Sequence, residues 1–363
     1  MTKPTSSIKV ALLGCGQIVD AHLSQIQRIP YANVVGVCDR HEELAYQAAK
    51  RYNIANYFND LDIMLEKVKP DVVHITTPAH THYPLAMQLL ERNYHVMVEK
   101  PFTQTLEETR TVLNAAQEKK LKICVGHDQN FDPMWLRFKK MIEAGIVGKV
   151  IHVESVQGYF LTGQFGSLVV ADSHHWVHKL PGGLFQNVIS HKVARMADII
   201  DLESHTLRGE WWCRPEYEFP SELDVSFFTT DHSCKLQFLT TIPPQRLTRV
   251  FGQKGTITID HDTQVIRHSP LPKLKGALAK LEAPFKLCGN SFANLARNVS
   301  RFIRSDIHYF DGMKNLFDAF YLSILNDTEA PIKPNEINLV TSLMEQIFNH
   351  CKSNEPLSKN QKR

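Results

Sequence analysis

Lys100 is the side chain in this sequence that is best suited to acid–base chemistry. It stands between Glu99 and Pro101, directly after the apolar run His95–Val98. Proline fixes its own backbone torsion and favours an extended conformation for the residue before it, so a strand that ends here would present the lysine at its carboxyl end. An amine in that position can remove or supply a hydroxyl proton, and Glu99 can orient it. The alternative is an ordinary solvated lysine at the end of a surface strand.

Asn187 and His191 form a second candidate group. They are four residues apart in a segment that we predict to be helical over Phe185–Leu202, so they should lie on one face of that helix. An imidazole exchanges protons near neutral pH, and an amide can both donate to and accept from hydroxyl groups. The pair could therefore bind and deprotonate an alcohol.

Three further residues are candidate ligand contacts. Trp176 could stack on the face of a sugar-like ligand, although inward packing is the alternative. His178 and His127 could bond to ligand hydroxyls, the latter from the end of the predicted strand Lys122–Val125. Histidines cluster around His178, but no carboxylate accompanies them at a clear helical spacing, so we predict no metal site.

Gly14 and Gly16 mark a nucleotide-binding turn. An apolar run, Ile8–Leu13, ends at the first glycine, and a helical pattern begins at Ile18 directly after Gln17. The first glycine allows the tight turn, and the second lets the backbone approach a pyrophosphate at the helix N-terminus. Gln17 and Ile18 then belong to the predicted cofactor site, while the alternative is an ordinary turn.

Asp39 ends a second apolar run, Val34–Cys38, at the distance from the glycine turn where a carboxylate accepts hydrogen bonds from the adenosine ribose. A carboxylate there also repels a 2′-phosphate, so the sequence favours NAD over NADP. Arg40 could stack on the adenine or tolerate a phosphate, which keeps NADP possible. The usual third glycine is Val19 here, and Asp39 could instead be a turn residue that closes a strand.

The elements that position these residues follow from hydrophobic periodicity. Short apolar runs alternate with helical patterns over the first part of the chain, which predicts an α/β fold with a doubly wound parallel sheet. After Gly148 the chain is rich in β-branched and aromatic residues with few helices between them, which predicts a mainly antiparallel sheet. We expect a dinucleotide-binding domain over residues 1–126, a second α/β domain over 127–335, and a C-terminal helix with a polar tail over 336–363.

Taken in order, these motifs resemble the glucose–fructose oxidoreductase/inositol dehydrogenase family (Gfo/Idh/MocA) across nearly the whole chain. The resemblance implies a Rossmann domain and a substrate-binding α/β domain whose open sheet mediates contacts in a homodimer or homotetramer. It also implies NAD(P)-dependent hydride transfer to or from a secondary alcohol of a sugar, cyclitol, sugar derivative or nucleotide sugar. The matching motifs are Gly14-Cys15-Gly16 with His22, Asp39-Arg40, Thr77-Pro78-Ala79-His80-Thr81-His82, Glu99-Lys100-Pro101, Gly182-Gly183 with His191, and Gly255-Thr256-Ile257.

The resemblance assigns roles to several residues. Lys100 and His191 would flank the alcohol carbon, and one of them would handle the hydroxyl proton. Asn187 stands where the family usually has aspartate, so we expect it to hold substrate hydroxyls rather than to carry charge. The cofactor site would further include Thr77, Pro78, His82 and Glu99.

Two other functions remain open. Asn187 is compatible with a catalytically silent NAD(P)-binding sensor, although the presence of Lys100 and His191 argues against it. The second is an NAD-dependent glycoside hydrolase, in which transient oxidation at C3 acidifies the C2–H bond and elimination follows.

Composition sets the broad class. The chain has 363 residues, 22% of them charged, and a net charge of +3, which is ordinary for a globular protein and too small to indicate a nucleic-acid partner. Its seven cysteines are odd in number and lack metal-site spacing, which favours reduced thiols. With no signal-like or membrane-spanning apolar run, we expect a cytoplasmic protein.

Residues 273–304 are basic, with seven Lys and Arg side chains against the single acid Glu282 and with apolar residues interleaved. We expect this segment to pack its apolar face on the core and to leave its charges in water. An anionic membrane surface and an anionic substrate such as a diphosphate are the alternatives.

Overall fold

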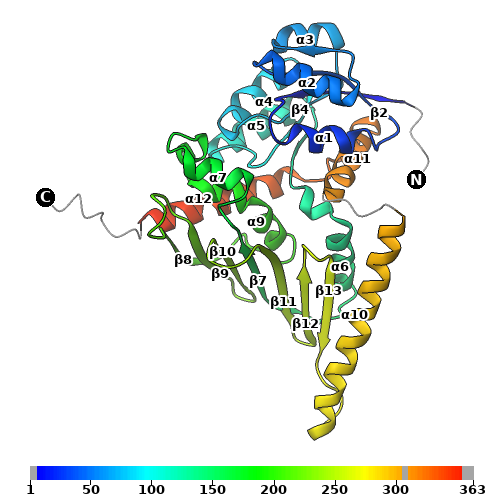
Figure 1. Ribbon diagram of the computed structural model, residues 1–363, viewed down its shortest axis with the longest axis vertical. Helices are drawn as coiled ribbons and strands as arrows, with labels where there is room; N and C mark the ends of the chain where they lie inside the picture. The colour runs from blue at the N-terminus through cyan, green and yellow to red at the C-terminus, as the bar shows by residue number, and fades with distance from the viewer. Residues whose placement is uncertain (1–5, 305–309, 354–363) are drawn as a thin grey trace, which may run out of the picture. The chain divides into compact units, whose positions relative to one another are not determined.

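The computed structural model describes residues 6–304 and 310–353, which form two compact units. The first contains residues 6–132 and 310–342, and the second contains residues 133–304 and 343–353. The chain therefore returns to the first unit over residues 310–342 and then ends its described part in the second (Figure 1). The expected boundaries, in contrast, kept 127–335 together in one domain.

A six-stranded sheet forms the centre of the first unit, with all of its strand pairs parallel. Its order, β3-β2-β1-β4-β5-β6, is that of doubly wound dinucleotide-binding folds. This confirms the predicted fold class for the N-terminal part, where each predicted strand is present. The strands are β1 (Ile8–Leu13), β2 (Ala32–Cys38), β3 (Tyr57–Phe58), β4 (Val72–Ile75), β5 (His95–Val98) and β6 (Ile123–Val125).

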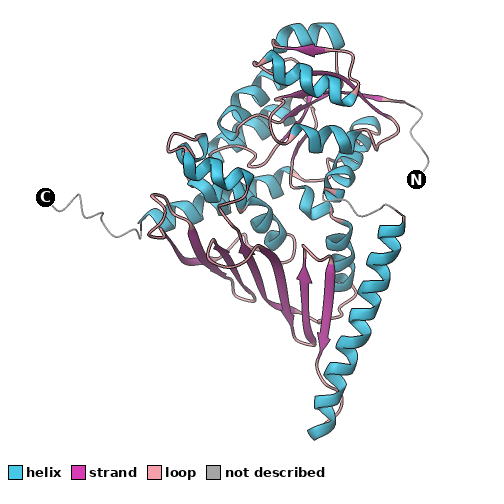
Figure 2. Ribbon diagram, viewed as in Figure 1, coloured by secondary structure: helices cyan, strands magenta, loops and turns pink. Residues whose placement is uncertain are grey.

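Helices follow the strands of this sheet, as the alternating pattern requires (Figure 2). Two of them begin at residues whose side chains accept from the first turn: Asp60 from the Ile63 amide at 3.0 Å and Thr105 from the Glu108 amide at 3.2 Å. The helices are α1 (Val19–Ile26), α2 (Glu42–Tyr52), α3 (Leu61–Val68), α4 (His82–Glu91), α5 (Leu106–Glu118) and α11 (Asp311–Leu325), with short 3₁₀ turns at Ala79–Thr81 and Asp128–Phe131.

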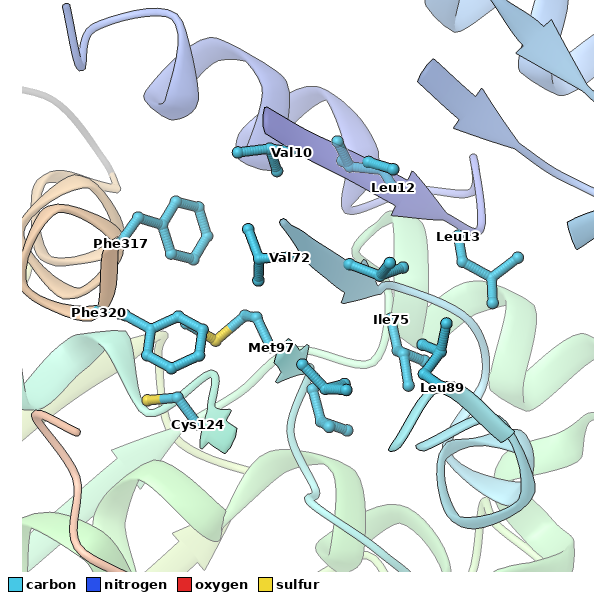
Figure 3. Close-up of a cluster of buried hydrophobic side chains, with 14 of the residues drawn as sticks. Val10, Leu12, Leu13, Val72, Ile75, Leu89, Met97, Cys124, Phe317 and Phe320 are labelled. Atoms are coloured by element: carbon cyan, nitrogen blue, oxygen red, sulfur yellow. The ribbon is translucent and has the colours of Figure 1, made fainter. Parts of the chain in front are cut away.

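Helix α11 completes the core of the first unit. Its Phe317 and Phe320 are buried and lie against the apolar side chains of the central strands, among them Val72 and Met97 (Figure 3). Burying two phenylalanines contributes roughly 3–6 kcal/mol. This helix lies far along the chain from the strands that it covers, so no local sequence pattern links it to the first unit.

The second unit contains a seven-stranded sheet in the order β13-β12-β11-β7-β10-β9-β8. Five of its six strand pairs are antiparallel and only β7 and β10 run parallel, so the prediction of a mainly antiparallel sheet is confirmed. The strands are β7 (Val150–Gly158), β8 (Thr206–Trp212), β9 (Glu222–Phe228), β10 (Ser233–Leu239), β11 (Gln245–Gly252), β12 (Gly255–Asp260) and β13 (Val265–Pro270).

Two predictions about the helices of the second unit are wrong. The single helix expected over Phe185–Leu202 is two helices that meet at Ile189. The basic segment does not pack its apolar face on the core, because Phe285 and Phe292 are 82% and 73% exposed. The helices are α6 (Pro133–Glu143), α7 (Gln164–Ala171), α8 (Gly183–Val188), α9 (Ser190–Ala197) and α10 (Ala279–Ile303), with 3₁₀ turns at Trp176–Lys179 and Gly276–Leu278; α12 (Pro334–Ser353) ends the described chain.

Candidate functional site

The turn after β1 has the geometry that only glycine adopts readily. Gly14 has φ +105°, and a Cβ on it would lie 2.8 Å from the backbone of Thr76 and Thr77. Its amide donates to the Cys38 carbonyl at 2.8 Å, and its own carbonyl accepts from the Thr76 hydroxyl at 2.6 Å. The turn is therefore fixed to the ends of β2 and β4 on both sides.

The backbone around Gly16 is open, whereas that around Gly14 is crowded. Apart from Gly16 itself and its two chain neighbours, no atom of the described chain lies within 4 Å of a Cβ built on Gly16. Its lack of a side chain therefore leaves open space beside the start of α1, whose first amides have no helical partner. An anionic group could approach the backbone here, which is what the second glycine of a dinucleotide turn permits.

Asp39 is tied to this turn. Its Oδ2 accepts from the Cys15 amide at 2.7 Å, and its Oδ1 accepts from the His41 amide at 2.9 Å. The structure thus brings the carboxylate at the end of β2 to the glycine turn, as the sequence spacing predicted. Arg40 is exposed beside it, with its Nε 3.3 Å from the His41 ring.

His82 joins two segments at the carboxyl edge of the sheet. Its ring is buried, with Nε2 2.9 Å from the Thr77 carbonyl and Nδ1 2.8 Å from the Pro101 carbonyl. Burial lowers the pKa of His82, although both carbonyls favour the charged ring. The histidine therefore links the Thr77-Pro78 turn to the segment that follows Lys100, and its ring nitrogens face protein atoms.

Glu99 is a buried carboxylate next to Lys100. Its Oε1 lies 2.8 Å from His22 Nε2, and its Oε2 accepts from the Lys100 amide at 3.1 Å. Burial alone would raise the pKa of Glu99, but the hydrogen bond from His22 and the positive charge of Lys100 outweigh it and the pKa is lowered. A Cβ at Gly126 would stand 2.9 Å from Oε1, so a glycine leaves the room that this carboxylate needs.

Two residues that the sequence analysis missed extend this contact into the core. His74 Nδ1 lies 3.0 Å from His22 Nδ1, and the Tyr321 hydroxyl lies 2.8 Å from His74 Nε2. The one signal for them is that His74 interrupts the otherwise apolar strand β4. Tyr321 gave no signal, because it comes from α11, far along the chain.

The charge on Glu99 sets the direction of one of these hydrogen bonds. An ionised carboxylate only accepts, so His22 Nε2–H donates to it. The contacts of His74 with His22 and with Tyr321 continue from this bond into the core. Burial and the adjacent His22 hold the pKa of His74 well below its usual value, and burial raises the pKa of Tyr321, so both remain neutral at physiological pH.

His127 follows β6 at the same edge and is buried. Burial lowers its pKa to about 4, with Lys100 acting in the same direction and Glu99 opposing. The structure therefore keeps this imidazole neutral. Lys100, Glu99 and His127 follow neighbouring strands β5 and β6 and influence one another electrostatically.

Asn187 and His191 lie in the second unit, at the end of α8 and the start of α9. Because the two helices meet at Ile189, the argument that placed both residues on the face of one continuous helix does not hold. His191 is buried and Asn187 is half-buried.

The turn before α8 is held in place from one side. A Cβ at Gly182 would collide with the ring of Phe348, which stacks on Trp211 at a centroid distance of 6.3 Å. The Gly182 amide donates to the side chain of Gln186 at 3.0 Å. These contacts fix the turn from which α8 and α9 extend.

Trp176 and His178 belong to the 3₁₀ turn Trp176–Lys179 of the second unit, and both are half-buried. His178 Nε2 donates to the Val169 carbonyl at 2.8 Å, and its ring packs on Phe219 at a centroid distance of 4.9 Å. The histidine therefore anchors α7 to this turn. Within residues 6–304 and 310–353, no three His, Cys, Asp or Glu side chains are grouped so that they could hold a metal ion.

Comparisons with known proteins agree with this geometry. A family model described as "Oxidoreductase family, NAD-binding Rossmann fold" (GFO_IDH_MocA) matches residues 8–127. Among curated proteins, the chain is 30% identical over 147 residues to D-glucoside 3-dehydrogenase of Escherichia coli (strain K12), covering 40% of this chain and 42% of that protein. It is 32% identical over 146 residues to scyllo-inositol 2-dehydrogenase (NAD(+)) of Bacillus subtilis (strain 168), covering 40% and 43%. Each match spans less than half the length of the relative.

Solved structures match the whole fold. The WlbA dehydrogenase from Bordetella pertussis, solved in complex with NADH and UDP-GlcNAcA, superposes with a TM-score of 0.77 at 18% identity, over 98% of this chain and 99% of that one. UDP-N-acetylglucosamine 3-dehydrogenase GnnA from Acidithiobacillus ferrooxidans gives a TM-score of 0.74 at 17% identity, over 96% and 98%. At these identities the likeness shows the fold alone.

Proposed function

We propose that the chain is an NAD-dependent dehydrogenase, because residues 8–127 match the Gfo/Idh/MocA oxidoreductase family with its NAD-binding Rossmann fold. Its substrate would be a secondary alcohol of a sugar, cyclitol, sugar derivative or nucleotide sugar. The observation that carries the proposal is Lys100 at the carboxyl end of β5, directly after a buried carboxylate held by His22.

The residues of the first unit fit the cofactor. The open space beside Gly16 and the adjacent start of α1 would receive the pyrophosphate, and Asp39 would accept from the adenosine ribose with its remaining lone pairs. A carboxylate at this position favours NAD over NADP. The further cofactor contacts would be Gly14, Gln17, Ile18, Arg40, Thr77 and Pro78. His82 and Glu99 would belong to the same site and position it through their bonds to the Thr77 carbonyl and the Lys100 amide.

Bound NAD would supply the redox chemistry by accepting a hydride from the alcohol carbon. The protein would manage the hydroxyl proton, with Lys100 or His191 as the base. Asn187 would hold substrate hydroxyls, because its amide can donate and accept at once. His127, Trp176 and His178 would add contacts to the sugar, and the sheet of the second unit would mediate contacts in a homodimer or homotetramer. No disulfide joins any two cysteines in the described chain, which suits the cytoplasm that we propose for it.

Nicotinamide reduction followed at 340 nm tests the proposal. The purified chain is incubated with NAD or NADP and a panel of sugars, inositols, sugar acids and nucleotide sugars, with Lys100→Ala as the control. Formation of NADH by the wild type, lost in the variant, is the expected result. Tight NAD binding by calorimetry with no turnover across the panel would contradict the dehydrogenase and favour a sensor.

The same panel separates the hydrolase alternative. A glycoside that is cleaved only when NAD is present, without net NADH, would replace the dehydrogenase by the redox-neutral reaction. Asn187→Asp restores the residue that is usual in the family. If Asn187 contacts the substrate, the pH–rate profile or KM changes, whereas an unchanged profile and KM would remove Asn187 from the site.

A further inference from the structure

Helix α10 carries an exposed stripe of apolar side chains, and this stripe has no counterpart in the mechanism proposed above. Most of its members are three, four or seven residues apart, so they lie on one side of the helix. Phe285 is 82% exposed, Phe302 is 76% exposed and Phe292 is 73% exposed. We call this set the α10 stripe: Leu278, Leu281, Phe285, Phe292, Leu295, Val299, Phe302 and Ile303.

The opposite side of the helix explains why the stripe faces outward. Asn290, Asn294 and Asn298 are spaced four apart and donate to carbonyls at and beside β13, at 2.9 Å to His268, 2.8 Å to Ile266 and 3.1 Å to Thr263. Since β13 is an edge strand, its unpaired backbone groups are the reason for this polar contact. The asparagines fix the rotation of the helix, and that rotation leaves the stripe in water.

The charged side chains of α10 are almost all positive, and most of them share the polar side of the helix with the asparagines. The helix and the residue after it carry five basic side chains against the single acid Glu282, which already pairs with Lys286. Lys280, Arg297 and Arg304 are exposed, as are Lys273 and Lys275 just before the helix. A helix with an apolar stripe on one side and a basic polar side is complementary to a surface that is apolar inside and anionic at its edge.

We propose that α10 docks on an anionic phospholipid bilayer, lying in the plane of the interface with the stripe among the acyl chains. Phenylalanine and leucine on one side with lysine and arginine on the polar side is the composition of interfacial helices. The docking does not require a spanning segment, and among the described helices none is long and apolar enough to cross a membrane.

Pairing with α10 of a second copy explains the observations less well. Two-stranded coiled coils favour β-branched residues at the core positions that Phe285 and Phe292 would occupy, and they use opposite charges beside the seam. Here the helix contains Pro284 and the flanking positions hold Gly289, Ala296 and Ser291, which offer no such charges. Two copies would also bring like charges together, whereas an anionic surface would neutralise them.

Co-sedimentation with vesicles tests the proposal. The full chain is mixed with vesicles of phosphatidylcholine alone or of an equal mixture of phosphatidylcholine and phosphatidylglycerol, at low and high salt. We expect pelleting only with the anionic vesicles and only at low salt. Phe285→Ser/Phe292→Ser and Lys280→Glu/Arg297→Glu should each weaken vesicle binding by about tenfold or more, the latter at about fivefold per charge removed.

Matched controls distinguish docking from general loss of solubility or of charge. Phe160→Ser removes an exposed phenylalanine elsewhere in the second unit, and Lys67→Glu/Lys140→Glu reverses two exposed charges on α3 and α6. Both controls should bind vesicles like the wild type. Equal losses in the controls would overturn the proposal, as would vesicle binding that is absent or indifferent to phosphatidylglycerol.

Two exposed cysteines allow a direct readout. Cys288 lies on the side of α10 that carries the stripe, and Cys213 follows β8. An environment-sensitive dye on Cys288, in a Cys213→Ser background, should shift to shorter emission wavelength on anionic vesicles, while the dye on Cys213 should not. Sedimentation without lipid supplies the remaining outcome: a dimer that Phe285→Ser/Phe292→Ser converts to monomer, with no vesicle binding, would assign the stripe to a second copy and overturn the proposal.

Discussion

Tyr321 and His74 meet through a 2.8 Å hydrogen bond although 247 residues separate them in the chain. A continuous row of hydrogen bonds runs from Tyr321 through His74 and His22 to Glu99, and at its end His22 Nε2–H donates to the ionised carboxylate. Oε1 of Glu99 accepts from His22, which belongs to the buried core, and Oε2 accepts from the Lys100 amide. The core of the first unit thus reaches the candidate acid–base residue through polar contacts.

Removing the Tyr321 hydroxyl should destabilise the first unit. In Tyr321→Phe the buried His74 Nε2 loses its hydrogen-bond partner, and an unsatisfied buried polar group costs about 1–3 kcal/mol. Urea unfolding measures the change. Tyr52→Phe is the matched control, because that hydroxyl bonds to the Asp20 carbonyl in an exposed setting, and its loss should cost well under about 1 kcal/mol. Equal losses in the two variants would show that the bond to His74 has no special weight.

Gly14→Ala and Gly16→Ala should fail in different ways. The first places a methyl group 2.8 Å from the backbone of Thr76 and Thr77 at a positive φ, so we expect a loss of more than about 2 kcal/mol in the free energy of unfolding. The second meets open space, so unfolding should change by less than about 0.5 kcal/mol. NAD affinity measured by calorimetry should nevertheless fall at least tenfold in Gly16→Ala, since the methyl group occupies the proposed path of the pyrophosphate. Unchanged affinity would place the pyrophosphate elsewhere.

Asp39→Asn should relax the preference between the two nicotinamide cofactors. The amide oxygen can still accept from the Cys15 amide, but the His41 amide loses its acceptor and the charge that repels a 2′-phosphate is gone. We expect NAD binding to weaken by about tenfold and the ratio of NADP to NAD affinity to rise, in titration calorimetry with each cofactor. If the ratio does not move, the carboxylate does not face the ribose. The thermal midpoint reports whether the turn itself survived.

His127 should make stability fall in mild acid. Its pKa is lowered to about 4 in the fold by burial, whereas in the unfolded chain it returns to about 6.5, so between these values the unfolded chain binds the extra proton. The stabilisation is present above pH 6.5 and is lost as the pH falls toward 4, by up to about 1.4 kcal/mol per pH unit. The measurement is urea unfolding across that window.

His127→Gln separates this contribution from those of the other buried histidines. The variant cannot titrate, so its stability should depend less steeply on pH than that of the wild type over the same window. Parallel curves for the two proteins would mean that His127 already binds its proton in the fold.

The sequence by itself determined the features that neighbouring residues specify. The glycine turn, the carboxylate at the end of β2 and Lys100 at the end of β5 were predictable, because each depends on a strand and the few residues that follow it. The α/β class was predictable for the same reason, since alternating strands and helices leave few ways to cover a parallel sheet.

Only the tertiary structure decided the rest, because those features depend on partners that are distant in sequence or on a competition between faces. Tyr321 reaches His74 only because α11 returns to the first unit. The division of the expected helix into α8 and α9 removed the shared face of Asn187 and His191. Helices usually pack their apolar side on the protein and expose their polar side, but α10 does the reverse. Its asparagines donate to backbone carbonyls of the edge strand β13, and its phenylalanines are exposed. Hydrophobic periodicity identifies an apolar side of a helix, but the polar groups that the fold must satisfy determine where that side points.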